Sequence, residues 1–266
     1  MRYTNPSTGN LSWQKTWFFC ESGIVHVMIN ILYSKSSAPV YSVLDQKRLS
    51  GPTFVNGNQS TATNITTPQT LWHNAVGYSF PGTTNTTLHI RQGARNSTWS
   101  SIGTSASPQT SVDMWAAWLE HRNTTEPFEY SIFPGIEQPN LEGQSRDAPI
   151  RSMVNNRNVS AIFDTRGSRV SIVFWQKDGG SAVVNTSPTL APLNVTSPAG
   201  MVLMLSLQDG VVTASDPSQS LTNATVDFAF GAGGLPPFWS WSERRRSMNI
   251  TFAKGGMAGS SVSGRL

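Results

Sequence analysis

Short apolar runs, either alternating with polar residues or continuous, recur along the whole chain and are its main structural signal. In the first half they predict strands at residues 24–32, 40–44, 71–80, 87–91, 112–119 and 128–133. In the second half they predict strands at residues 159–163, 170–175, 201–207, 211–214, 225–230 and 248–252. No window keeps a 3.6-residue apolar period over three turns, so the sequence predicts an all-β protein built from sandwiches.

Turn-forming residues separate these runs and indicate how the strands are connected. The pair Asp209-Gly210 predicts a two-residue hairpin, because Gly readily adopts positive φ. Residues 134–149 replace the apolar alternation with Pro, Gly, Gln and charged residues, which marks a domain junction. We therefore expect two β domains, residues 1–140 and 141–266, with a loose tail over the last ten residues.

The chain is polar but weakly charged, which narrows the partners that it could bind. Charged residues make up 13% of the 266 residues, and the net charge is +4. This small excess is compatible with an acidic partner, but its one dense run, residues 244–246, is more typical of a solvated turn. We expect no nucleic-acid partner, because neither a basic stripe with aromatics nor a known module is present. We also expect no membrane span, because no apolar stretch reaches roughly 18 residues.

Glycosylation signals favour a secreted protein. The acceptor pattern Asn-x-Ser/Thr, without Pro in the middle, occurs eleven times, where composition alone would give about four. Compositional bias in this Ser/Thr-rich chain is the alternative explanation for some of them. No signal peptide is visible at Met1, so we expect an internal methionine and a signal peptide lost with a missing N-terminus. The candidate glycosylation sites are Asn10, Asn58, Asn64, Asn85, Asn96, Asn123, Asn158, Asn185, Asn194, Asn223 and Asn249.

The residue pattern nominates no catalytic or metal-binding cluster. The four His residues and the carboxylates are dispersed, and the single cysteine, Cys20, is expected to be a small buried hydrophobe. Trp rings can stack on the C–H faces of sugars, although most of those in strands are expected to be core. The carbohydrate-stacking candidates are Trp72, Trp99, Trp239 and Trp241, with Trp115 and Trp118 considered beside them.

Five motifs, in order along nearly the whole chain, resemble one known family. The first is Leu11-Ser12-Trp13-Gln14-Lys15-Thr16-Trp17-Phe18-Phe19, continuing through Gly23-Ile24-Val25 to Val43-Leu44-Asp45-Gln46. The others are Trp99-Ser100-Ser101-Ile102-Gly103, Trp118-Leu119-Glu120-His121, Tyr130-Ser131-Ile132-Phe133-Pro134 and Ser215-Asp216-Pro217-Ser218-Gln219. Together they resemble polysaccharide lyase family 8, which includes hyaluronate, chondroitin AC and xanthan lyases.

The resemblance implies a fold and a reaction, but it places no catalytic residue in this chain. It implies the later part of an antiparallel β-supersandwich followed by a smaller C-terminal β-sandwich. In this family an upstream α/α toroid cleaves acidic polysaccharides by β-elimination with Asn, His, Tyr and Arg. The nine-residue separation of His121 and Tyr130 resembles that of the catalytic His and Tyr, but these residues match β-domain motifs, so we interpret the spacing as coincidence.

The resemblance also sets expectations for activity and partners. We expect the chain alone to be an inactive, non-catalytic scaffold of a secreted lyase that is a monomer at full length and takes an acidic polysaccharide as its substrate. We expect the protein to need no cofactor. Only the resemblance suggests bound Ca²⁺, and the sequence shows no carboxylate cluster that would hold it. Two alternatives stay open: an autonomous carbohydrate-binding β-sandwich protein and a cell-wall or adhesion glycoprotein.

Overall fold

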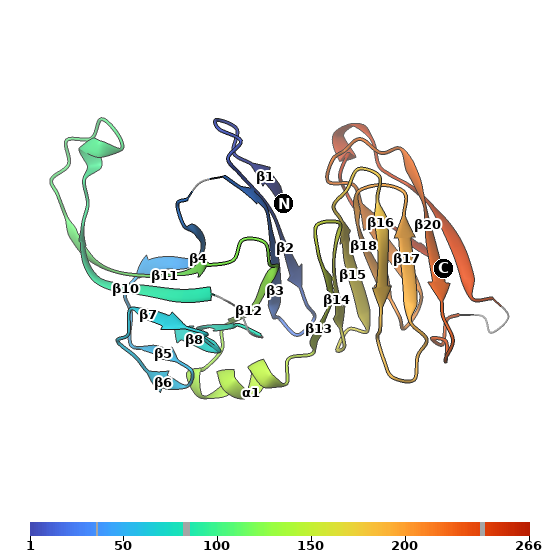
Figure 1. Ribbon diagram of the computed structural model, residues 1–266, viewed down its shortest axis with the longest axis horizontal. Coiled ribbons are helices and arrows are strands. Elements are labelled where there is room, and N and C mark those ends of the chain that lie inside the picture. Colours follow the sequence, from blue (N-terminus) through green and yellow to red (C-terminus); the bar gives the residue numbers. More distant parts are fainter. Residues whose placement is uncertain (36, 82–85, 240–242) are drawn as a thin grey trace. The chain divides into compact units, whose positions relative to one another are not determined.

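The computed structural model describes residues 1–266 except 36, 82–85 and 240–242, and nearly all of its regular structure is antiparallel β-sheet (Figure 1). The all-β fold class expected from the sequence is therefore confirmed. The described chain forms two compact units. Unit 1 comprises Met1–Tyr3, Trp13–Leu32 and Ala148–Leu266, and unit 2 comprises Thr4–Ser12 and Tyr33–Asp147. The division of the chain at residue 140 stays a prediction.

Unit 1 contains most of the three N-terminal strands and all of the strands after residue 148. Strands β1, β2 and β3 are neighbours in that order, a six-stranded sheet has the order β13-β14-β15-β18-β19-β22, and a four-stranded sheet has the order β16-β17-β20-β21. The strands are β1 (Arg2–Thr4), β2 (Leu11–Phe19), β3 (Val25–Ser34), β13 (Ile150–Asn155), β14 (Val159–Asp164), β15 (Arg169–Phe174), β16 (Gly180–Val184), β17 (Leu193–Ser197), β18 (Met201–Ser206), β19 (Val211–Ser215), β20 (Asn223–Phe230), β21 (Arg245–Thr251) and β22 (Val262–Arg265).

The six-stranded sheet of unit 1 is covered on both faces. One face forms a large apolar core with the four-stranded sheet, centred on residues such as Leu203 and Phe228, which are fully buried. Against the other face, Phe18 and Met28 of the β2–β3 hairpin pack on Ile162 and Val173. All six residues of β14 are consequently buried, which explains why this segment lacks polar alternation.

Unit 2 contains two antiparallel sheets and a short helix. One sheet has strands in the order β12-β9-β8-β5-β6, and the other has the order β4-β11-β10-β7. The 3₁₀ turns are η1 (Trp99–Ser101) and η2 (Gln138–Asn140) in unit 2 and η3 (Gly255–Met257) in unit 1. The remaining elements of unit 2 are β4 (Val40–Arg48), β5 (Thr53–Val55), β6 (Asn58–Gln59), β7 (Asn64–Thr66), β8 (Thr70–His73), β9 (Val76–Ser79), β10 (Thr86–Asn96), β11 (Ser111–His121), β12 (Phe128–Pro134) and α1 (Leu141–Arg146).

The core of unit 2 includes polar and aromatic groups as well as aliphatic ones. Trp115 is fully buried, and its ring stacks on that of His73 with centroids 4.3 Å apart. The Trp115 indole N–H donates to Thr53 Oγ1 at 2.9 Å, and the ammonium nitrogen of Lys47 lies 5.4 Å from the centroid of the Trp115 ring. Burial lowers the pKa of His73, so its imidazole is neutral in this environment.

Three local expectations from the sequence are wrong, each for a structural reason. The run at residues 71–80 is two strands, β8 and β9, because Asn74 and Ala75 both adopt positive φ and form a tight turn. The β18–β19 hairpin has a four-residue loop, residues 207–210, rather than two, because the Gly210 N–H donates to the Ser206 carbonyl and closes a longer turn. The last ten residues are not a loose tail, because β22 pairs with β19.

Candidate functional site

The carbohydrate-stacking candidates that the structure describes lie in different local environments. Trp72 on β8 is half-buried, and its indole N–H donates to the Ile136 carbonyl at 2.8 Å. Trp99 begins η1 and is 47% exposed. Trp239 is 2% exposed, so its ring offers no face to a sugar, and this burial corrects its assignment. Trp241 lies outside the described residues.

Trp118, in contrast, lies on the outward face of the sheet β4-β11-β10-β7. Residues alternate between the two faces of a strand, and Trp115, Ala117 and Leu119 are fully buried on the inner face. Trp118 is therefore directed outward, opposite Val43 on one side and His89 on the other. The same alternation and register direct further side chains outward, and we call this set the basic–aromatic face: Tyr41, Arg48, His89, Arg91, Arg95 and Trp118.

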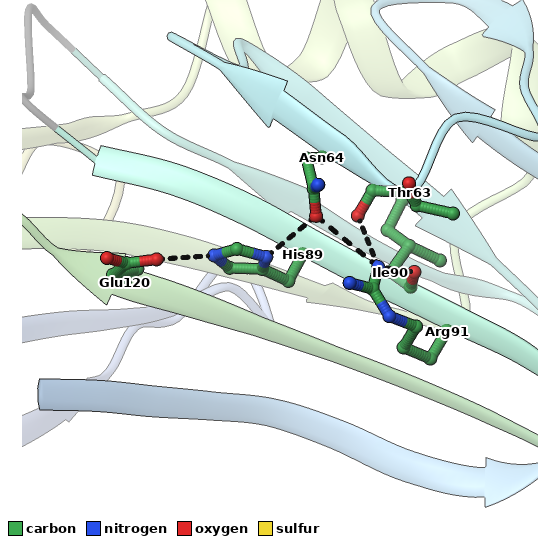
Figure 2. A network of polar contacts seen from close by, with 6 residues as sticks. All are labelled: Thr63, Asn64, His89, Ile90, Arg91 and Glu120. Atoms are coloured by element: carbon green, nitrogen blue, oxygen red, sulfur yellow. Dashed lines mark hydrogen bonds and ion pairs between the residues drawn. The ribbon is translucent and has the colours of Figure 1, made fainter. Parts of the chain in front are cut away.

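Hydrogen bonds across three strands hold part of this face in place (Figure 2). His89 contacts Glu120 Oε2 through Nε2 at 2.7 Å and Asn64 Oδ1 through Nδ1 at 2.8 Å. Arg91 Nη1 donates to the carbonyls of Thr63 and Ile90, both at 2.9 Å, and to Asn64 Oδ1 at 3.3 Å. These hydrogen bonds therefore fix the His89 ring and one end of the Arg91 guanidinium.

Aromatic contacts hold the rings of Tyr41, His89 and Trp118 against one another. The His89 and Trp118 rings stack with centroids 5.5 Å apart, and the Arg91 guanidinium lies 5.7 Å from the Trp118 ring centroid. The Tyr41 ring is nearly perpendicular to both, with centroids 6.1 Å from His89 and 6.4 Å from Trp118. Tyr41 is half exposed, so one of the supported rings is accessible to a ligand.

The arginines of this face differ in their partners from four arginines of unit 1. Within the described ranges, Arg48, Arg91 and Arg95 have no carboxylate within ion-pair distance. In unit 1, four arginines have such a partner: Arg169 pairs with Glu21, Arg245 with Asp227, Arg246 with Glu243 and Arg265 with Asp209. The dense run at residues 244–246 is thus largely compensated, whereas the basic–aromatic face is not.

His121 and Tyr130 do not form an accessible catalytic pair. His121 Nε2 contacts Ser42 Oγ at 2.7 Å, and its ring meets Phe128 edge-on. Tyr130 is 2% exposed, and burial raises the pKa of its hydroxyl far above the usual value. A phenol that is buried and protonated cannot reach a polysaccharide as a base, which supports the interpretation of their spacing as coincidence.

The structure also bears on Cys20, on metal-binding clusters and on membrane-spanning segments. Burial raises the pKa of the Cys20 thiol to about 12, with a further contribution from the Asp164 carboxylate, so the thiol stays protonated and unreactive at neutral pH. In the described ranges, no cluster of three or more His, Cys, Asp or Glu side chains is placed to hold a metal ion. None of the described helices is both long enough and apolar enough to cross a membrane.

The candidate glycosylation sites lie at the surface wherever the structure describes them. Asn123 and Asn194 are partly buried, and Asn85 lies outside the described residues. The remaining eight are exposed: Asn10, Asn58, Asn64, Asn96, Asn158, Asn185, Asn223 and Asn249. Exposure leaves these eight side chains accessible for modification.

Comparisons with protein families confirm the resemblance found in the sequence. Residues 1–145 match the model described as polysaccharide lyase family 8, super-sandwich domain. Residues 153–225 match the model described as polysaccharide lyase family 8, C-terminal beta-sandwich domain. A search of curated proteins found no match.

Solved structures with the same fold come from larger lyases. A chondroitinase AC lyase, solved in complexes with oligosaccharides, is 21% identical with a TM-score of 0.80, and the match covers 98% of this chain and 37% of that one. A xanthan lyase from Paenibacillus is 19% identical with a TM-score of 0.75, and the match covers 99% and 26%. A chondroitin AC lyase from Streptomyces coelicolor, in complex with chondroitin sulphate, is 18% identical with a TM-score of 0.67, and the match covers 95% and 32%. This chain therefore spans only about a quarter to just over a third of their length.

Proposed function

This chain belongs to polysaccharide lyase family 8, and on that premise we propose that it is the non-catalytic β-portion of a secreted lyase. The lyase would cleave uronic-acid-containing polysaccharides by β-elimination, with its catalytic groups in a helical portion outside residues 1–266. One observation carries this proposal: the chain matches both β-domains of the family but covers only 26% to 37% of the three lyase structures. The β-portion would act as a scaffold and contribute to polysaccharide binding.

The first test is a turnover measurement on the isolated chain. β-Elimination leaves an unsaturated uronate, which absorbs in the ultraviolet, so product can be followed directly in solutions of hyaluronan, chondroitin and xanthan. We expect no product from this chain and rapid product from a complete family 8 lyase acting on the same substrates. Robust turnover by this chain alone would contradict the assignment of catalysis to another portion.

The genomic sequence upstream of Met1 supplies an independent test of the same proposal. We expect an open reading frame that encodes helical repeats containing Asn, His and Tyr. Non-coding sequence there would favour the second candidate function, an autonomous carbohydrate-binding protein. The uncompensated arginines and half-exposed Tyr41 of the basic–aromatic face are the observations that favour this second candidate.

We also propose that the protein is extracellular and carries N-linked glycans. Eight of its acceptor asparagines are exposed, which supports modification at several positions. When the protein is produced through a eukaryotic secretory pathway, we expect treatment with peptide N-glycosidase to lower its apparent mass in several discrete steps. Asn58→Gln and Asn223→Gln should each remove one step. An unchanged mass after enzyme treatment would contradict the proposal.

A further inference from the structure

We propose that the basic–aromatic face binds an acidic polysaccharide directly, with its anionic groups on Arg48, Arg91 and Arg95 and a sugar ring on Tyr41. The inference deepens the proposed function and takes its ligand class from it. Three properties of these residues support this ligand: their charge, the accessible ring of Tyr41, and side chains that are already held in place without a ligand.

Charge is the first argument. The three guanidinium groups lie on one face of one sheet, and among the described residues none has a carboxylate partner. Glu120 is the carboxylate directed outward from these strands, and it already contacts His89 at 2.7 Å. Asp45 and Asp113 lie on the opposite pleat. Uncompensated guanidinium groups favour sulfate and carboxylate ligands, which accept paired hydrogen bonds from them.

The Tyr41 ring is the second argument. A sugar presents C–H groups on its broad face, and an aromatic ring offers a matching apolar surface with a polar edge. Tyr41 is 50% exposed, and Trp118 and His89 support it edge-on. The face thus combines a ring for a pyranose with cations for its acidic substituents, whereas a neutral glycan would use only the ring.

The third argument is that the Arg91 side chain is held in place before a ligand binds. The bonds from Arg91 Nη1 to Thr63, Ile90 and Asn64 occupy one guanidinium nitrogen. Within the described part of the chain, Nε and Nη2 of Arg91 have no hydrogen-bond partner, so both can donate to a ligand. A guanidinium that is held in place loses less conformational entropy on binding than a free one.

The dimensions of the face suit a polymer. Outward positions repeat every two residues, about 7 Å apart along a strand, and neighbouring strands are about 5 Å apart. The rows that pair Tyr41 with Glu120 and Arg48 with Met114 are three outward positions apart, roughly 20 Å by this spacing. A linear polysaccharide can therefore contact Tyr41 and the arginines at once.

The test measures binding by the full chain, without reference to turnover. Chondroitin sulfate, hyaluronan and xanthan serve as acidic probes and dextran as the neutral one, with dissociation constants from calorimetry. We expect saturable binding to at least one acidic probe and none to dextran. Arg91→Gln and Tyr41→Ala should each weaken that binding about tenfold. Arg245→Gln removes the same charge from a pair with Asp227 and should weaken it less than twofold.

Two results would overturn the inference. One is the absence of saturable binding to all three acidic probes by a folded wild-type chain. The other is an equal loss of affinity in Arg91→Gln and Arg245→Gln with no effect of Tyr41→Ala, which would indicate binding through net charge alone. Thermal unfolding of each variant distinguishes lost binding from lost structure. Either result leaves the assignment of the chain as the non-catalytic β-portion of a lyase standing, because that assignment is tested by turnover and by the upstream reading frame; only its contribution to polysaccharide binding would be withdrawn.

Discussion

Trp115→Ala is expected to lower the free energy of unfolding by about 4 kcal/mol, the range for removing a large buried ring. The ring is fully buried in unit 2, stacks on His73, and hydrogen-bonds Thr53. Its loss would leave a cavity between the sheets and deprive both partners of their contacts. Denaturant unfolding, followed by circular dichroism, measures the change.

Two control variants separate this effect from a general sensitivity of the sheet. Trp115→Phe keeps an aromatic ring against His73 but loses the bond to Thr53 Oγ1, so a smaller loss is expected. Trp118→Ala removes a ring from the outward face of the same strand, where it is only partly buried, and should cost much less stability. Equal losses for Trp115→Ala and Trp118→Ala would contradict the assignment of Trp115 to the core.

Asp216→Ala is expected to cost about 3 kcal/mol, because four hydrogen bonds to a buried carboxylate disappear together. Oδ1 of Asp216 accepts from the backbone N–H and hydroxyl of Ser218, at 2.8 and 2.6 Å. Oδ2 accepts from the N–H groups of Ser220 and Leu221, both at 2.7 Å. Asp216 is 1% exposed, so its carboxylate accepts these hydrogen bonds out of contact with water. Thermal or denaturant unfolding measures the loss.

The pH dependence of Asp216 gives this prediction a second measurement. Burial alone raises the pKa of its carboxyl, but the hydrogen bonds from Ser218, Leu221 and Ser220 outweigh it and hold the pKa below its ordinary value. The stabilisation is therefore fully present above the unfolded-state pKa, near 3.9, and is lost as the pH falls through the lower folded-state pKa. The stability difference between wild type and Asp216→Asn should shrink over that range. A difference that stays constant down to pH 2 would contradict this account.

Asp209 provides a matched control for Asp216. It also accepts a backbone N–H, from Val211 at 3.2 Å, but its side chain is 51% exposed. Water can replace that bond, so Asp209→Ala should reduce stability far less than Asp216→Ala.

Much of the fold is predictable from the sequence because the order of apolar and polar residues in a strand follows which of its faces are buried. The apolar run at residues 159–163 reflects a strand with both faces covered, and the alternation at residues 225–230 reflects one with a single covered face. The errors arise where backbone geometry decides. Ala75 carries no turn signal, yet it adopts positive φ and divides a predicted strand. Strand β22 is rich in Ser and Gly and forms through pairing with β19.

The candidate site was less predictable, because it depends on strand register. The sequence nominated Trp rings one at a time, and it gave no reason to group Tyr41 with Arg91. These residues are fifty positions apart and meet through the pairing of β4 and β10 with β11. The alternation in the predicted strand at residues 87–91 did contain a usable signal, since it placed His89 and Arg91 on the polar side. The predicted strand at residues 112–119 gave no such signal for Trp118, because both of its sides are mostly apolar.

The complete burial of β14 depends on strands from both ends of the chain. One side of this strand is covered by a hairpin from the first thirty-four residues, and the other by strands that follow residue 180. The contact of Asn30 with Asn155 alone spans 125 positions. Contacts between residues so distant in sequence slow folding. A proteolytic cut that released the hairpin would expose Ile162 and Val173 to water.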